Sequence, residues 1–308
     1  MTLTAEQLEI RRRGLGSSDI AAVAGLNPWR KPIDVYLEKT GRAEASVPTM
    51  RTRVGHALEE RIAELYAEDL GYVLHETMLP GTTVVSEAEP WLVATPDFIA
   101  HDIDRAPRIV EVKVVGARLA HHWSDGLPDY VLAQILHQQR VTGIRLGTCA
   151  ALIGGTDFQT FDCPYLLEVA DDLAEIGRVF WYEHVLKDIP PPIDGSESWR
   201  AYAARRWPSD SKPMLAATEE AEALAKRLAE ARARETFAAD ERAVCETELK
   251  ALIGDHAGIR GSSWQVTWKG RAGSTSWKQI AEELGATPDL IEKHRGAPTR
   301  VFAFKTEG

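Results

Sequence analysis

The stretch "TPDFIAHDIDRAPRIVEVKVV", residues 95–115, places an aspartate directly after a proline and then a glutamate and a lysine inside a valine-rich strand. Side chains alternate between the two faces of a strand, so Glu111 and Lys113 share one face with Ile109 and Val115. The opposite face carries only valines. Because an unpaired buried charge is costly, both charged side chains need partners.

Two interpretations satisfy that need. Glu111 and Lys113 can form an ion pair with each other on an edge strand. Alternatively, Asp97, which follows Pro96 at the end of the WLVAT strand (91–95), can lie beside Glu111 across a hairpin. Two carboxylates that converge next to a lysine attract a hard divalent cation such as Mg²⁺, which prefers oxygen ligands. An aspartate followed at a distance by Glu-x-Lys also resembles the pattern of the PD-(D/E)xK nucleases.

Further motifs surround this core in a fixed order. They are RRRGLGSSDIAAVAGLNPWRKPIDVYLEKTG (11–41), GHALEERIAELY (55–66) and LPDYVLAQILHQQRVTG (127–143). Together with the TPD…EVK core, they resemble the YqaJ-like viral recombinases, relatives of phage lambda exonuclease, over about residues 10–190. The resemblance implies a restriction-endonuclease-like core. The sequence pattern agrees, because strands flanked by helices without regular βαβ repeats favour an α/β fold with a mixed central sheet.

The resemblance also implies roles for the residues of the core. Asp97 would be shared between two Mg²⁺ or Mn²⁺ ions, and Glu111 would bind the hydrolytic ion together with the main-chain carbonyl of Val112. Lys113 would orient or deprotonate the attacking water and offset negative charge in the transition state. Glu59, in the family's G-x-x-x-E helix, would be an outer metal ligand.

A second group of residues is assigned to DNA by the same resemblance. Gln134 and Gln138, one helical turn apart, match a helix that lines the site, Gln134 among the catalytic residues and Gln138 among those that contact DNA. Arg11 and Ser18, with Ser17 beside them, correspond to residues that bind the 5′-terminal phosphate. An arginine and a hydroxyl near a helix start suit a terminal dianion.

Simpler interpretations stay open for several of these residues. Glu59 and both glutamines can be solvated side chains of surface helices, and Arg11–Arg13 can be a solvated basic turn. Ser18 can be a helix cap. Trp29 is interpreted as a core residue, with a base-stacking wedge as the alternative.

The sequence predicts four parts along the chain. Residues 1–195 form the nuclease domain, and 196–213, rich in Pro, Ser, Trp and charge, form a linker. Residues 214–256 form a long helix or helical hairpin, because they are dense in Ala, Glu, Arg and Leu. A narrow apolar seam runs through this part at Leu224, Leu228, Ala231 and Ala238. Residues 257–308, with WQVTWKG (264–270) and RVFAFK (300–305), form a small α+β segment.

Composition excludes several classes of protein. No apolar run approaches the length of a membrane span, and the N-terminal residues lack the pattern of an export signal. The three cysteines stand far apart, which leaves a disulfide framework, a zinc knuckle and an iron–sulfur cluster unsupported. We therefore expect a cytoplasmic protein, and the resemblance implies a bacterial host cell and a phage or prophage origin. The net charge of −10 argues against a uniformly basic nucleic-acid binder, although basic clusters remain at Arg11–Arg13 and Arg30–Lys31.

These observations lead to one functional hypothesis. We expect a metal-dependent 5′-to-3′ exonuclease that acts on double-stranded DNA ends and leaves 3′ single strands for recombination. A single-strand annealing protein is the expected partner, and a ring of three copies the expected assembly, both by resemblance. The alternatives are an endonuclease of the same superfamily and a DNA-binding recombination factor without catalysis.

Overall fold

The computed structural model describes residues 5–43, 49–74, 82–101, 107–270 and 276–294 of the chain. The chain divides into two compact units, Met1–Tyr202 and Ala203–Gly308, and each is described by itself. Among the described helices, none is both long enough and apolar enough to cross a bilayer.

The first unit combines helices and a sheet. Its helices are α1 (Ala5–Arg12), α2 (Ser17–Val23), α3 (Pro32–Lys39), α4 (Met50–Leu70), the 3₁₀ helix η1 (Ala117–Trp123), α5 (Asp129–Thr142), α6 (Leu167–Val179) and the π-helical turn η2 (Phe180–Val185). Its strands are β1 (Val73–Leu74), β2 (Val84–Val85), β3 (Val93–Ala94), β4 (Phe98–His101), β5 (Arg108–Val115), β6 (Leu146–Ile153) and β7 (Asp157–Pro164).

The central sheet has the order β1-β4-β5-β6-β7. Among its described strands, β5 pairs with β6 in parallel, and the other neighbours are antiparallel. The mixed sheet that the sequence predicts is therefore confirmed. The valine-rich strand β5 lies between β4 and β6, so the interpretation that places it at a sheet edge is wrong. Its many β-branched residues suit a strand that is covered on both faces.

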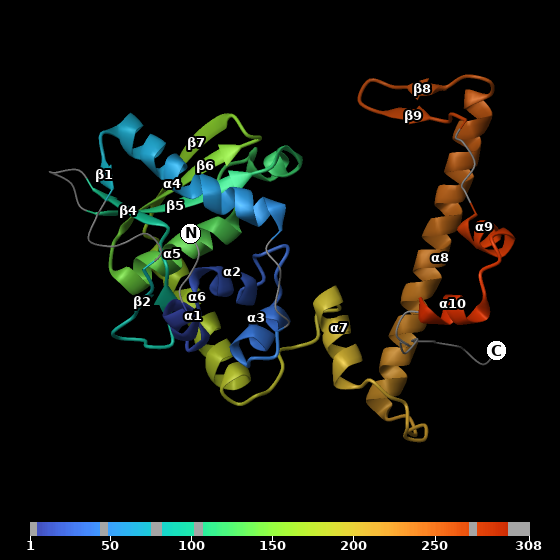
Figure 1. Ribbon diagram of the computed structural model, residues 1–308, viewed down its shortest axis with the longest axis horizontal. Helices are drawn as coiled ribbons and strands as arrows, with labels where there is room; N and C mark the ends of the chain where they lie inside the picture. The colour runs from blue at the N-terminus through green and yellow to red at the C-terminus, as the bar shows by residue number, and fades with distance from the viewer. Residues whose placement is uncertain (1–4, 44–48, 75–81, 102–106, 271–275, 295–308) are drawn as a thin grey trace. The chain divides into compact units, whose positions relative to one another are not determined.

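Helices cover the two faces of this sheet (Figure 1). Val110 and Val112 of β5 pack against Ile62 and Tyr66 of α4 on one face. The opposite face of the sheet packs against α5, which contributes Val131 and Ile135 among others. The alternation of β5 thus directs Glu111 and Lys113 toward the α5 side, as the sequence pattern predicts.

A further layer covers the outer side of α5. Helices α2, α3 and α6 bury their apolar side chains there, including Ile20, Tyr36 and Leu173. Gly177 of α6 allows close packing, because a Cβ at this position would lie 2.4 Å from a methyl of Ile20. This layer holds the N-terminal motif 11–41 against the helix that faces the sheet.

The predicted linker begins with ordered structure. Helix α7 (Glu197–Arg206) occupies much of 196–213, and its Trp199 is buried in the core of the first unit. The indole of Trp199 donates to the carbonyl of Pro192 at 3.0 Å. The first unit therefore extends past residue 195.

The second unit is built on one long helix, α8 (Glu219–Ile253), of 35 residues. The sequence allowed a helical hairpin here, and the structure has a single helix. A short hairpin follows, β8 (Gly258–Arg260) and β9 (Gln265–Thr267), and then α9 (Trp277–Glu283) and α10 (Pro288–Lys293). The predicted strand at 300–305 lies outside the described residues.

Candidate active site

Asp97 and Glu111 lie side by side at the start of the β4–β5 pair. The register Phe98↔Val110 brings Asp97, one residue before β4, next to the middle of β5. Its Oδ2 accepts a hydrogen bond from the main-chain N–H of Val112 at 2.9 Å. Glu111 is buried, 5% exposed, and its carboxylate pairs with the Lys113 amine. Both interpretations of the opening sequence therefore hold in part, since the ion pair and the converging carboxylates coexist.

This cluster holds two carboxylates, Asp97 and Glu111, and one ammonium group, Lys113. Burial and the adjacent Glu111 carboxylate raise the pKa of Asp97 to about 8, although Lys113 acts in the opposite direction. Burial alone would lower the pKa of Lys113, but Glu111 and Asp97 outweigh it and raise that pKa above its ordinary value. Two carboxylates thus share one ammonium group, and an added cation would relieve their repulsion.

Glu59 lies on α4 at the margin of this cluster. Its side chain is 25% exposed, and its Oε1 is 4.0 Å from the His56 ring. Its charge contributes to the raised pKa of Asp97, after Glu111 and burial. Within the described ranges, however, no three carboxylate, imidazole or thiolate groups stand close enough together to hold a metal ion. Glu59 therefore does not complete a three-carboxylate site in this conformation.

Two glutamines of α5 face the cluster and are buried. The amide of Gln138 donates to Oε2 of Glu111 at 2.7 Å and lies 3.4 Å from the hydroxyl of Ser17. Gln134 is 8% exposed, and its carbonyl oxygen, like that of Gln138, has no hydrogen-bond partner among the residues that the structure describes. Surface positions for these glutamines are therefore excluded. A buried oxygen without a hydrogen-bond partner is a position where a water, an ion or a ligand can bind.

Arg11, Ser17 and Ser18 lie around the junction between α1 and α2. Gly16 caps α2, so neither serine is the N-cap residue. The Arg11 guanidinium passes within 3.9 Å of the point where a Cβ of Gly16 would lie. Because Gln138 reaches both Ser17 and Glu111, this corner is connected to the carboxylate cluster through one side chain.

Sequence reasoning missed a buried ion cluster beneath this corner. Asp19, 1% exposed, contacts Lys39 at 2.6 Å and Arg30 at 2.5 Å, and it accepts from the N–H of Gly16 at 2.8 Å. Lys39 is equally buried and also donates to the carbonyl of Arg11 at 2.7 Å. Burial opposes ionisation of Asp19, but both cations outweigh it and hold its pKa well below the usual range.

This cluster corrects one expectation about charge. Arg30 was grouped with Lys31 as a basic surface cluster, yet its guanidinium is bound by Asp19 and by Glu38 at 2.6 Å. Arg30 therefore holds the fold together and is not available as surface charge. The one sequence signal was an aspartate inside the apolar helical run SSDIAAV, and no local signal identified its partner Lys39.

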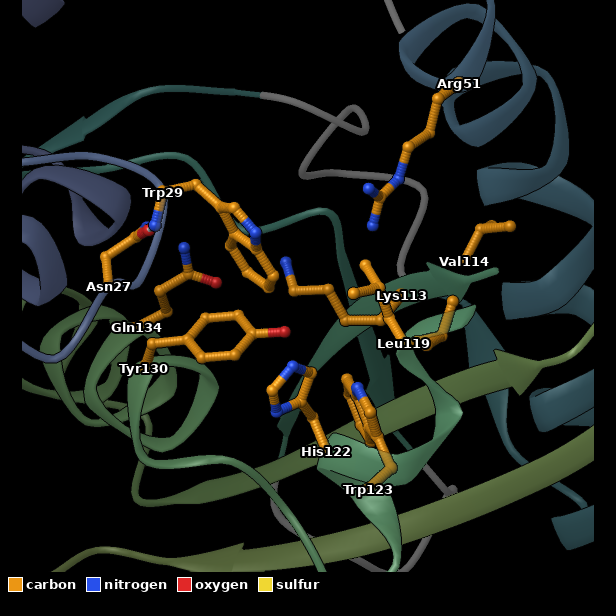
Figure 2. Close-up of a pocket in the computed structure, with 11 residues that line it drawn as sticks. Asn27, Trp29, Arg51, Lys113, Val114, Leu119, His122, Trp123, Tyr130 and Gln134 are labelled. Carbon is orange, nitrogen blue, oxygen red and sulfur yellow. The ribbon is translucent and has the colours of Figure 1, made fainter. Parts of the chain in front are cut away.

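A cavity of about 210 Å³ opens beside Lys113 (Figure 2). Figure 2 shows the Lys113 amine, the Trp29 ring and the Tyr130 hydroxyl turned toward the same space. Trp29 packs edge-to-face on Tyr130 with 5.3 Å between ring centroids, and it is 54% exposed. The interpretation of Trp29 as a core residue is therefore wrong, because the ring lies at the rim of the cavity. Gln134 and Arg51 complete the wall on either side of Lys113.

Comparisons with known proteins identify a similar domain and a similar fold. Residues 6–145 match the model of the YqaJ-like viral recombinase domain. The protein YqaJ of Bacillus subtilis (strain 168) is 28% identical over 210 residues, which are 66% of this chain and 63% of that relative's length. Two solved structures share the fold. The alkaline exonuclease LHK-Exo of Laribacter hongkongensis has a TM-score of 0.50 and 15% identity, over 66% of this chain and 100% of that one.

The structure of LHK-Exo in complex with dAMP gives a TM-score of 0.50 and 16% identity, over 66% of this chain and 97% of that one. At this level of identity the likeness concerns the fold. The first unit of this chain thus shares its fold with an alkaline exonuclease, and its residues 6–145 are similar to the YqaJ-like viral recombinase domain.

Proposed function

We propose that the protein is a metal-dependent exonuclease that degrades double-stranded DNA from its ends in the 5′-to-3′ direction. The resulting 3′ single strands would serve homologous recombination. The observation that carries the proposal is the convergence of Asp97, Glu111 and Lys113 beside a cavity lined by aromatic rings. The similarity of residues 6–145 to the YqaJ-like viral recombinase domain and the fold shared with an alkaline exonuclease support it.

The donor groups fit a hard divalent cation. Asp97 and Glu111 offer carboxylate oxygens, and the Val112 carbonyl is a third candidate ligand. Because Mg²⁺ commonly keeps several waters, two carboxylates and a carbonyl suffice for it. Glu59 would reach the ion through water, and a second Mg²⁺ or Mn²⁺ would share Asp97. The ions would supply charge neutralisation at the scissile phosphate and lower the pKa of bound water.

The side chains around the ions would position the substrate. Lys113, whose amine faces the cavity, would hold the attacking water or the phosphate. Gln138 donates to Glu111 and so fixes the orientation of that carboxylate. The unpartnered oxygen of Gln134 would accept from a water or from a base. Trp29 at the rim would stack on a base, an interaction that every base can make.

Recognition of the 5′ end is assigned to the corner formed by Arg11, Ser17 and Ser18. A guanidinium and two hydroxyls suit a terminal phosphate dianion. This corner is joined to Glu111 through Gln138, so an end bound there would set the distance to the scissile bond. That coupling favours an exonuclease over an endonuclease, which requires no end.

Three further parts of the proposal concern context. We infer that the nuclease units assemble as a ring of three around DNA, that a single-strand annealing protein receives the 3′ strand, and that the protein works in the cytoplasm of a bacterial host. Support for these points is the similarity of residues 6–145 to the YqaJ-like viral recombinase domain.

One comparison tests the function. Purified protein is incubated with Mg²⁺ and either linear duplex or covalently closed circular duplex, and products are resolved by length and strand. An exonuclease degrades the linear form alone and leaves 3′ single strands. Cleavage of both forms would indicate the endonuclease, and cleavage of neither, with intact binding, the non-catalytic factor. Glu111→Gln serves as the inactive control.

A further inference from the structure

Two rows of residues run along helix α8. Each row repeats every seven residues, and successive positions along the chain alternate between the rows at spacings of three and four. One row contains Ala221, Leu228, Glu235, Arg242 and Leu249. The other contains Leu224, Ala231, Ala238, Cys245 and Leu252. This is the heptad spacing of a coiled-coil seam. The helix is uninterrupted from Glu219 to Ile253 (Figure 1), so both rows run along one continuous face.

The seam is largely open within the chain. Leu224 is 52% exposed and Leu252 is 73% exposed, and Cys245 is also exposed. A helix of this length with exposed leucines at heptad spacing is typical of a helix that pairs with another helix.

The charges that flank the seam change sign along the helix. On the side next to the first row stand Arg227 and Arg234 in the N-terminal half and Glu241 and Glu248 in the C-terminal half, with Glu220 on the same edge in the first turn. Flanking charges of this kind determine partner choice and orientation in coiled coils. Between Arg227 and Glu248 this edge is basic toward the N-terminus and acidic toward the C-terminus, so this part of the helix is complementary to a reversed copy of itself.

We propose that α8 pairs with α8 of a second copy of this chain as an antiparallel coiled coil. In the favoured register Leu228 lies opposite Cys245 of the second copy, and Leu224 lies opposite Leu249. Arg227 then faces Glu248 of the second copy, and Arg234 faces Glu241. Two-fold symmetry repeats both ion pairs, so four opposite-charge contacts flank the seam.

The same register accommodates the two polar residues of the seam. Glu235 lies opposite Ala238 of the second copy, and Arg242 lies opposite Ala231. The small alanine side chains leave room for the longer ones to reach the edge of the interface. Arg242 also contacts Glu246 of its own helix at 3.6 Å, which partly balances its charge.

A parallel pair is disfavoured by the same charges. In register, it would place Arg227 against Arg232 of the second copy and Glu241 against Glu246. A shift of the antiparallel register by one heptad would place Glu241 against Glu241 of the second copy. Like charges at these positions are destabilising, so the charge pattern selects one orientation and one register.

Cysteine cross-linking tests this pairing in the full-length protein. Leu228→Cys places a thiol opposite Cys245 of the second copy, and mild oxidation should give a covalent dimer. The wild type should not cross-link through Cys245, because the two Cys245 thiols would lie roughly 25 Å apart at about 1.5 Å of helix per residue. Ala233→Cys, on the outer side of the helix, is the matched control and should stay uncrosslinked.

Charge reversal gives an independent readout. Arg227→Glu combined with Arg234→Glu should halve the mass of the assembly measured by light scattering, whatever assembly the first unit forms. Adding Glu241→Arg and Glu248→Arg to the same chain restores the complementarity and should restore the mass. Circular dichroism checks that α8 stays helical. Efficient wild-type disulfide formation would demonstrate a parallel pair, and a mass unaffected by charge reversal would show that α8 does not pair with a second copy; either result overturns the proposal.

Discussion

Replacing Asp19 by asparagine should destabilise the first unit strongly. The Asp19 carboxylate is 1% exposed and neutralises two cations, Lys39 at 2.6 Å and Arg30 at 2.5 Å. The Lys39 side chain is as buried as that of Asp19. Without the Asp19 carboxylate, the Lys39 amine would keep two contacts, the Arg11 carbonyl at 2.7 Å and the Glu38 carboxylate at 3.8 Å. Breaking a buried ion pair from one side typically costs about 3–5 kcal/mol, because the remaining charge stays buried without compensation.

Chemical unfolding measures this cost. Near-UV circular dichroism reports the packing of buried aromatic residues such as Trp181 and follows the first unit. The matched control is Glu175→Gln, which removes a carboxylate bound to Arg178 at 2.6 Å on the surface and should change stability little. A loss below about 1 kcal/mol for Asp19→Asn would refute the reasoning, since it would mean that the cluster is hydrated or that Lys39 releases its proton.

The same cluster predicts how stability depends on pH. Lys39 and Arg30 hold the pKa of Asp19 below its usual range in the folded protein, whereas the unfolded chain has the ordinary value. The stabilisation is therefore complete above the unfolded pKa and is lost as the pH falls toward the folded pKa. Asp19→Asn should remove this part of the acid dependence, so that wild type and variant converge in stability at low pH.

The remaining predictions concern the site. Lys113→Met should reduce DNA hydrolysis by at least about 100-fold, a usual size for loss of a general acid–base group, with circular dichroism unchanged; near-normal turnover would contradict its role. Burial and Glu111 raise the pKa of Asp97 to about 8, and a bound metal ion must displace the Asp97 proton. Metal affinity should therefore increase as the pH rises through about 8. Titration calorimetry with Mg²⁺ in buffers of different ionisation enthalpy checks both the trend and the proton release. Arg11→Ala should slow digestion of 5′-phosphorylated duplex far more than of 5′-hydroxyl duplex, and an equal effect on both would make Arg11 a general backbone contact.

Local patterns predicted the centre of the candidate site. Alternation along β5 was enough to place Glu111 and Lys113 on one face, and the proline before Asp97 indicated where the preceding strand segment ends. Both inferences depend on neighbours in sequence or across one hairpin, where strand geometry leaves little freedom. The helices α4 and α5 were predictable for a similar reason, since their apolar residues recur at helical spacing.

Contacts between distant elements could not be predicted in the same way. The bond from Gln138 to Glu111 depends on how α5 is rotated above β5, and the pairing of Asp19 with Lys39 depends on the packing of α2 against α3. No spacing in the sequence fixes either. The position of Trp29 could not be predicted either. Its size suggested a core residue, but the chain holds it at the rim of a cavity beside Tyr130.

The distribution of ion pairs explains how an acidic chain can still bind DNA. Several basic side chains of the first unit are bound to carboxylates of the same chain, including Arg30 by the buried Asp19 and Arg140 by Glu89 and Asp171. They contribute to the fold and add little to the surface potential. The cations that face the cavity are Lys113 and Arg51. A net charge of −10 is therefore compatible with a local site for phosphate, because the low-dielectric walls of a cleft concentrate the field of a few charges there. The same arrangement leaves few cations at the cavity of one copy, which is the reason that the proposed assembly of several copies would strengthen the hold on a long duplex.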